Sequence, residues 1–110
     1  MPDLCVTRLD RMPRDADGRL ADDLFLAPDL AVEIVSPKQP LIRLVRRCVW
    51  YVDNGVERAL LADPADRSVL RFSKGDAPRA QRLDEALDFG TVLAGFVLTV
   101  GELFAALRLP

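Results

Sequence analysis

The chain has 110 residues, half of them hydrophobic, with 15 basic and 17 acidic side chains and a formal net charge of −2. This composition predicts a single soluble domain with a hydrophobic core, and it excludes a disordered polyampholyte and a basic arm that binds nucleic acid. The sequence contains no histidine, which excludes Ser-His-Asp and Cys-His nucleophile systems, histidine-ligated zinc and imidazole acid–base catalysis.

The first half of the chain predicts two strands separated by a loop. Residues 4–7 form a short strand with β-branched character, and residues 10–23, rich in Asp, Arg, Pro and Gly, form an exposed loop. A second strand lies between Pro28 and Pro37, where apolar residues alternate on one face and the other face carries Glu33. We expect this strand to be buried, with one carboxylate projecting from it.

Residues 41–54 have the apolar spacing of an amphipathic helix. Pro40 suits the first turn, and Asn54-Gly55 supplies a left-handed stop. Trp50 should lie at the margin of the packed face and be more exposed than Val49. The side chains expected to pack on the sheet are Leu41, Val45, Cys48, Val49 and Val52. The polar side of the helix carries Arg43, Arg46 and Arg47.

The second half of the chain predicts a hairpin and a closing helix. Residues 56–62 and 68–72 are strands, and their connection is short enough for a hairpin. Residues 74–80 form a polar turn, and residues 100–107 form a helix that packs on the sheet. The order of elements predicts one α/β domain with a mixed β-sheet, one crossover helix and a C-terminal helix.

The cysteines and the N-terminal residues indicate the cellular compartment of the protein. Cys5 and Cys48 stand alone in apolar stretches and form no CxxC pair, so we expect two buried, reduced thiols rather than a zinc site or a disulfide framework. There is no signal-peptide pattern, and no apolar run approaches about 18 residues. We therefore expect a cytoplasmic protein with no membrane partner.

Glu33 is the first candidate for chemistry, because a lone carboxylate in a buried strand is costly unless it is paired or binds a metal. One interpretation is a salt bridge to an arginine of the helix, and the other is a ligand for a hard cation such as Mg²⁺. Asp29 lies roughly 13 Å away along an extended strand, too far to share one ion. Asp3, directly before the first strand, is the better second ligand, its alternative being a turn or cap residue.

A set of short motifs extends over nearly the whole chain. They are PDLCV at 2–6, RMP at 11–13, APDLAVEIVSP at 27–37, Tyr51, Gly55-Val56, Asp63-Pro64, VLAGF at 92–96 and VGELF at 100–104. Taken in this order, the motifs resemble the Uma-two-type restriction endonuclease family of the PD-(D/E)XK nuclease superfamily. The resemblance implies a restriction-endonuclease-like core.

The resemblance also implies roles for individual residues. Asp3 corresponds to the strand aspartate and Glu33 to the second acidic ligand of Mg²⁺ or Mn²⁺, with the peptide carbonyl of Ile34 as a third contact. The family's lysine, four residues before the tyrosine, is replaced here by Arg47. Arginine can hold a phosphate oxygen but cannot give up a proton, so the replacement implies an impaired enzyme.

Three hypotheses follow. The first is a Mg²⁺-dependent endonuclease that hydrolyses DNA phosphodiester bonds at Asp3, Glu33 and Arg47, with Arg43 and Arg46 on the DNA backbone. The second is a catalytically inactive nuclease-fold module that binds a partner or dimerises. The third is a generic α/β domain whose arginine helix is only solvated.

The resemblance also bears on the extent of the domain. The family normally begins with a helix and strands upstream of the first Pro-Asp, whereas this chain begins at that Pro-Asp. We therefore expect residues 1–110 to be a single, N-terminally incomplete domain. A sheet left uncovered in this way would be completed by a partner, such as a second copy in a homodimer.

Overall fold

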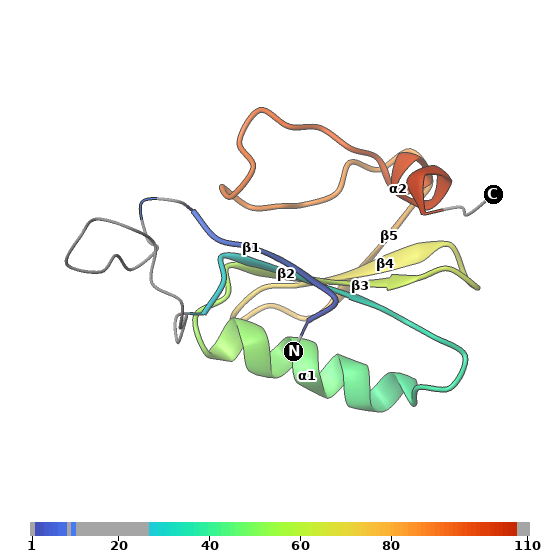
Figure 1. Ribbon diagram of the computed structural model, residues 1–110, viewed down its shortest axis with the longest axis horizontal. Helices are drawn as coiled ribbons and strands as arrows, with labels where there is room; N and C mark the ends of the chain where they lie inside the picture. The colour runs from blue at the N-terminus through green and yellow to red at the C-terminus, as the bar shows by residue number, and fades with distance from the viewer. Residues whose placement is uncertain (1, 9, 11–26, 108–110) are drawn as a thin grey trace, which may run out of the picture.

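The computed structural model describes residues 2–8, 10 and 27–107, which form a five-stranded sheet with one helix on one face and a loop and a second helix on the other (Figure 1). The elements are β1 (Leu4–Val6), β2 (Leu30–Ile34), α1 (Leu41–Asp53), β3 (Arg58–Asp63), β4 (Ser68–Phe72), β5 (Arg79–Arg82) and α2 (Val100–Ala106). The predicted loop at 10–23 lies outside the described residues, except for Asp10.

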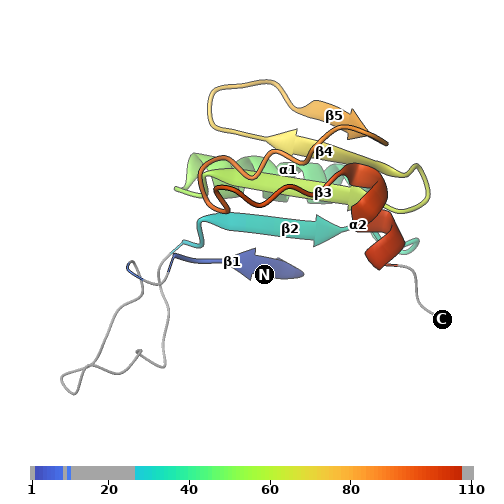
Figure 2. The same cartoon turned by 90° about the horizontal axis from the view of Figure 1, so that it is seen from above.

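The sheet is mixed. Its strands lie in the order β1-β2-β3-β4-β5, and only β2 and β3 are parallel among these neighbours (Figure 2). A parallel pair requires a crossover that returns the chain to the same end of the sheet, and α1 provides it. The mixed sheet, the crossover helix and the C-terminal helix confirm the predicted fold class.

α1 begins and ends where the sequence predicts, to within one residue. Pro40 precedes it in an extended conformation. At its other end the backbone N–H of Asn54 donates to the carbonyls of Trp50 and Tyr51, and Gly55 follows with a φ of 107°. In the described part of the chain, no helix has the length and apolar character needed to cross a membrane.

The face that α1 turns toward the sheet differs from the predicted one. Its buried side chains are Leu44, Cys48, Tyr51 and Val52. The prediction that Leu41 and Val49 pack on the sheet is wrong, since they are 47% and 39% exposed. The helix is rotated so that Tyr51 faces the sheet, where its hydroxyl finds a hydrogen-bond partner. Trp50, at 61%, is more exposed than Val49, as predicted.

β3 and β4 form the predicted hairpin, and β4 has the predicted bounds. The interpretation of residues 74–80 as only a polar turn is wrong, because β5 begins at Arg79 and extends the sheet beyond β4. The sequence of β5, RAQR, does not predict a strand, because it lacks the alternation of apolar residues on which a strand prediction depends. An edge strand can be held by backbone hydrogen bonds on one side, and the buried side chain of β5 is Gln81.

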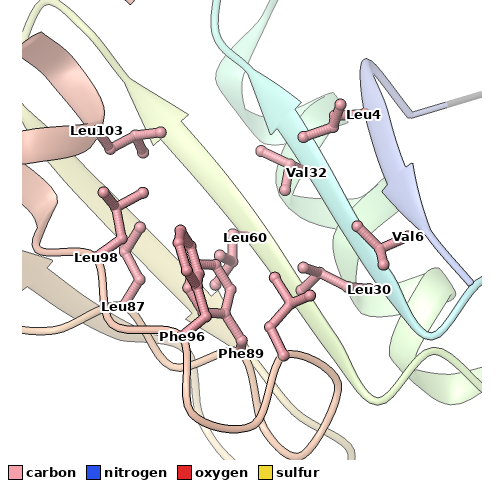
Figure 3. Close-up of a pocket in the computed structure, with 11 residues that line it drawn as sticks. Leu4, Val6, Leu30, Val32, Leu60, Leu87, Phe89, Phe96, Leu98 and Leu103 are labelled. Carbon is pink, nitrogen blue, oxygen red and sulfur yellow. The ribbon is translucent and has the colours of Figure 1, made fainter. Parts of the chain in front are cut away.

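Alternate residues of β2 point to opposite faces of the sheet, as predicted. Ala31 packs in the cluster under α1, whereas Leu30 and Val32 pack against the loop at 87–98 and α2. On this second face a pocket of about 170 Å³ remains, with an apolar lining. Figure 3 shows strand side chains meeting loop side chains around it.

Candidate active site

Glu33 lies in the second-last position of β2, and only 1% of its surface is exposed. The Tyr51 hydroxyl donates a hydrogen bond of 2.8 Å to Glu33 Oε1. Arg47 Nη1 lies 3.6 Å from the same oxygen. Arg47 and Tyr51 are four residues apart on α1 and therefore project from the same side of the helix. The ion pair with a helix arginine, one of the two interpretations of Glu33, is thus present.

The two oxygens of the Glu33 carboxylate have different surroundings. Oε1 receives the Tyr51 hydrogen bond and the nearest approach of Arg47. Oε2 accepts no hydrogen bond from any residue in the described ranges 2–8, 10 and 27–107. One oxygen is therefore anchored to α1, and the other keeps its capacity to bind a ligand.

Asp3 lies beside Glu33, directly before the neighbouring strand β1. β1 runs antiparallel to β2 with Leu4 opposite Val32, which brings the preceding residue, Asp3, next to Glu33. Asp3 Oδ2 accepts a hydrogen bond of 2.7 Å from the backbone N–H of Ile34, the residue that follows Glu33. The hypothesis of a shared metal ion requires this proximity. That both carboxylates bind one ion stays a prediction.

Asp29 belongs to a different polar cluster. Its carboxylate accepts a hydrogen bond of 2.6 Å from the backbone N–H of Arg8 and lies 3.4 Å from the Arg8 guanidinium. The same guanidinium approaches Glu57 to within 3.5 Å. Asp29 is therefore engaged at the start of β2, which agrees with its exclusion as a partner of Glu33.

Burial controls the protonation of the two other polar groups under α1. Burial first, and the charge of Glu33 second, raise the pKa of the Cys48 thiol to about 12. Burial and then the hydrogen bond to Glu33 raise the pKa of Tyr51 well above its ordinary value. Both groups stay protonated at neutral pH, so Tyr51 is a hydrogen-bond donor and Cys48 is not a nucleophile.

The two cysteines lie in different environments. Cys48 is buried, but Cys5 is exposed, so the prediction of two buried thiols is wrong for Cys5. The reason is its place on β1, an edge strand, whereas α1 packs over β2, β3 and β4. An apolar neighbourhood in the sequence does not reveal which strand lies at the edge of the sheet.

The arginines predicted to contact DNA lie on the outer side of α1. Arg43 and Arg46 are exposed, and neither forms an ion pair within the part of the chain that the structure describes. Trp50 is exposed on the same helix, and its ring meets that of Tyr51 edge to face with centroids 6.0 Å apart. The surface of α1 thus presents two arginines that pair with no acidic residue in the described ranges, and an aromatic ring.

Tyr51 is the residue of this site whose contact the sequence reasoning missed. The sequence identified it only as a motif residue of the family, yet its hydroxyl donates a hydrogen bond of 2.8 Å to Glu33. The available signal was the four-residue spacing from Arg47 on the helix that directly follows the strand of Glu33. A crossover helix packs on the strands that it connects, so its inward polar residues are natural partners for a buried carboxylate.

The mixed sheet with its β2–α1–β3 crossover, and with Glu33 on β2 next to Asp3, which directly precedes β1, agrees with the restriction-endonuclease-like class of α/β folds. Within this class, the chain belongs to the Uma2 family, described as "Putative restriction endonuclease", whose model matches residues 1–101. This match confirms the family that the motifs predicted.

The fold also occurs in a solved structure. It is the crystal structure of "a putative nuclease belonging to DUF820" from Anabaena variabilis, with a TM-score of 0.90 and 24% sequence identity. The match covers 98% of this chain but 61% of that one, so this chain spans less than two thirds of its structural relative. A search of curated proteins gave no match.

Proposed function

We propose that this chain is a divalent-metal-dependent nuclease domain that hydrolyses the phosphodiester bonds of DNA. The observation that supports the proposal most is the buried Glu33 carboxylate, with Oε1 held by α1 and Oε2 accepting no hydrogen bond from the described residues. Asp3 lies next to it, directly before β1. Membership of a family described as restriction endonucleases supports the same activity.

The donor set suits a hard cation such as Mg²⁺ or Mn²⁺. Asp3 and Glu33 would hold it, with the carbonyl of Ile34 as a third contact. The described residues contain no group of three His, Cys, Asp or Glu side chains that could enclose a metal. Mg²⁺ does not need one, because it is often bound by one or two carboxylates and keeps several waters. When bound, the cation would neutralise charge on the scissile phosphate and activate water.

Arg47 is the proposed charge-stabilising residue. One of its nitrogens faces Glu33 Oε1 at 3.6 Å, and the guanidinium has further N–H donors that can hold a phosphate oxygen. Because arginine stays protonated, it cannot accept a proton from the attacking water as a lysine could. We therefore propose that hydrolysis is slow.

Arg43 and Arg46 are the proposed contacts to the DNA backbone. Both are exposed on the helix that carries Arg47. The net charge of −2 gives the chain no general attraction to DNA. Binding should therefore be local to α1, weak, and strongly reduced by salt, since each phosphate contact releases counterions.

Plasmid nicking in the presence of Mg²⁺ or Mn²⁺ tests this function. The wild type should cleave slowly, Glu33→Ala should not cleave, and Arg47→Lys should cleave faster by about 10²-fold, the lower end of what a general acid or base contributes. Arg79→Lys makes the same change on β5, where the arginine pairs with Glu85, and should leave cleavage unchanged.

A second candidate function is a catalytically inactive nuclease-fold module that binds a partner or forms a homodimer. The observation in its favour is that Arg47 already pairs with Glu33, so the carboxylate is compensated without a metal. This candidate is the better account if Arg47→Lys does not cleave and calorimetry finds no Mn²⁺ binding. Light scattering of the chain in solution would then measure whether it dimerises.

A further inference from the structure

Tyr51 is the closest partner of Glu33, and the proposed reaction gives it no role. Its side chain is buried, with 7% of the residue exposed. The hydroxyl oxygen lies 2.8 Å from Glu33 Oε1, whereas the nearest nitrogen of Arg47 lies 3.6 Å from it. The edge-to-face contact with Trp50 supports the ring from the outer side of α1.

A glutamate needs such a partner if it is to present one oxygen in a constant direction. The last torsion of a glutamate side chain is broad, so the plane of an unanchored carboxylate varies. A hydrogen bond to one oxygen restricts this torsion and thereby fixes where the other oxygen points. Carboxylates that bind metals usually have such a partner, and its loss costs about 10–100-fold in metal affinity or activity.

We propose that Tyr51 is the positioning residue of the Glu33 carboxylate. Its hydroxyl holds Oε1, so that Oε2 is the oxygen that binds the divalent cation. This inference rests on the metal site of the proposed function, and it assigns Tyr51 no contact with either DNA or metal. Arg47 adds positive charge near Oε1 from a longer distance, whereas Tyr51 supplies the directional hydrogen bond.

The first test measures Mn²⁺ binding to the full chain by calorimetry, without DNA. Tyr51→Phe keeps the ring and removes the hydroxyl, and it should weaken Mn²⁺ binding by about tenfold or more. Glu33→Gln should abolish measurable binding. Cys48→Ala is the matched control, because this buried residue lies on the same face of α1 and forms no hydrogen bond to Glu33 within the described residues. Its Mn²⁺ affinity should equal that of the wild type.

The second test uses the fact that Tyr51 is the only tyrosine of the chain. A cation on Glu33 withdraws electron density from the carboxylate and weakens the hydrogen bond that it accepts. Saturating Mg²⁺ should therefore shift the near-ultraviolet absorption band of Tyr51. The shift should be absent in Glu33→Gln, and a Trp50→Phe background removes the overlapping absorption of the single tryptophan.

The outcomes separate this inference from the function on which it rests. Wild-type Mn²⁺ affinity in Tyr51→Phe, with binding lost in Glu33→Gln, overturns the role of Tyr51 and leaves the metal site in place. Unchanged binding in Glu33→Gln overturns both. If Tyr51→Phe does not fold, the spectrum of the Trp50→Phe protein, which keeps Tyr51, is the deciding measurement, and the absence of a band shift at saturating Mg²⁺ overturns the inference. A tenfold loss of affinity together with the band shift supports it, even if plasmid is not cleaved.

Discussion

The two faces of the sheet are built from alternate residues of the same strands, but their chemistry differs. Under α1, apolar side chains such as Ala31, Ala59 and Phe72 surround the polar group of Glu33 and Tyr51. On the opposite face, the described residues around a pocket carry only apolar side chains, and these include Leu30, Val32, Leu60, Phe89 and Leu98 (Figure 3). A register shift of one residue in β2 would exchange the faces of its own residues, so that Leu30 and Val32 would point toward α1 and Glu33 toward the pocket.

We expect the pocket face to contribute mainly to the stability of the fold and the α1 face to contribute to the proposed metal binding. The pocket face depends on side-chain volume, because its contacts are apolar and have little directionality. The α1 face depends on particular atoms, since one hydroxyl and one guanidinium compensate a buried carboxylate. Substitutions on the pocket face should therefore change the free energy of unfolding, and substitutions at the polar group should change metal affinity.

The largest expected effect is on the pocket face. Leu60 is 2% exposed and lines the pocket, so Leu60→Ala would enlarge a space that is already present. The free energy of unfolding should fall by about 2–5 kcal/mol, from the lost apolar contact and the larger cavity. Urea unfolding followed by circular dichroism measures the loss, and the Mn²⁺ affinity of the folded fraction should not change.

Val97→Ala provides the comparison for Leu60→Ala. Val97 is 72% exposed, and the free energy of unfolding should change by less than about 0.5 kcal/mol. If both variants lose the same stability, the pocket face is not a packed core. If Leu60→Ala also loses Mn²⁺ binding, the two faces of the sheet are coupled.

The next largest expected effect is a loss of Mn²⁺ affinity from a substitution at the proposed metal site. Asp3→Asn removes the negative charge, while its amide oxygen can still accept the hydrogen bond from the Ile34 N–H. The Mn²⁺ affinity should fall at least tenfold, about 1.4 kcal/mol, because a neutral amide is a weaker ligand than a carboxylate for a hard cation.

Asp84→Asn makes the same change of charge at an exposed position away from Glu33. Calorimetry should show wild-type Mn²⁺ affinity for this control. An equal loss in the two variants would mean that the overall charge of the chain, and not the position of Asp3, governs binding.

The sequence predicts an element closely where its apolar residues are periodic and where residues such as Pro or Asn-Gly mark its ends. β2 lies between Pro28 and Pro37, and α1 lies between Pro40 and Asn54-Gly55, so both were predicted closely. β5 follows Pro78 directly but has no apolar alternation, and its backbone hydrogen bonds to β4 stabilise it. Those bonds join backbone groups of two consecutive strands, so they leave no pattern of apolar side chains in the sequence of β5.

The candidate site likewise contains a residue that the sequence predicts and contacts that it does not. Glu33 was predictable because a carboxylate in a buried strand must have a partner. Which helix residue reaches it depends on the rotation of α1, and the apolar side chains from Leu41 to Val52 cover too wide an arc to determine that rotation. Burial of Tyr51 in place of Val49 is therefore a result of tertiary packing. The neighbouring position of Asp3 likewise required the register of β1.

High pH should lower the free energy of unfolding through the buried thiol of Cys48 on α1. The pKa of Cys48 is about 12 in the folded protein, against an ordinary value of 9.0. Between these values the unfolded chain loses a proton that the folded chain keeps, so the free energy of unfolding falls as the pH rises. For one group the slope is at most about 1.4 kcal/mol per pH unit, and below pH 9 the effect vanishes.

Urea unfolding of the wild type and Cys48→Ala at increasing pH isolates this contribution. The stability of the wild type relative to the variant should stay constant up to about pH 9 and then decrease. A difference that does not depend on pH would show that the Cys48 thiol titrates alike in both states.

The smallest expected effect concerns α2, which closes the pocket face. This helix has seven residues, too few to be stable from intrinsic propensity alone. The Thr99 hydroxyl accepts a hydrogen bond from the Glu102 N–H at 3.1 Å, and the Glu102 carboxylate accepts one from the Thr99 N–H at 3.0 Å. Thr99→Ala removes the first of these and should cost about 1 kcal/mol of unfolding free energy, whereas Thr99→Ser keeps the hydroxyl and should cost less. Equal stability of the two variants would mean that the packing of Val100 and Phe104, and not the cap, holds α2 in place.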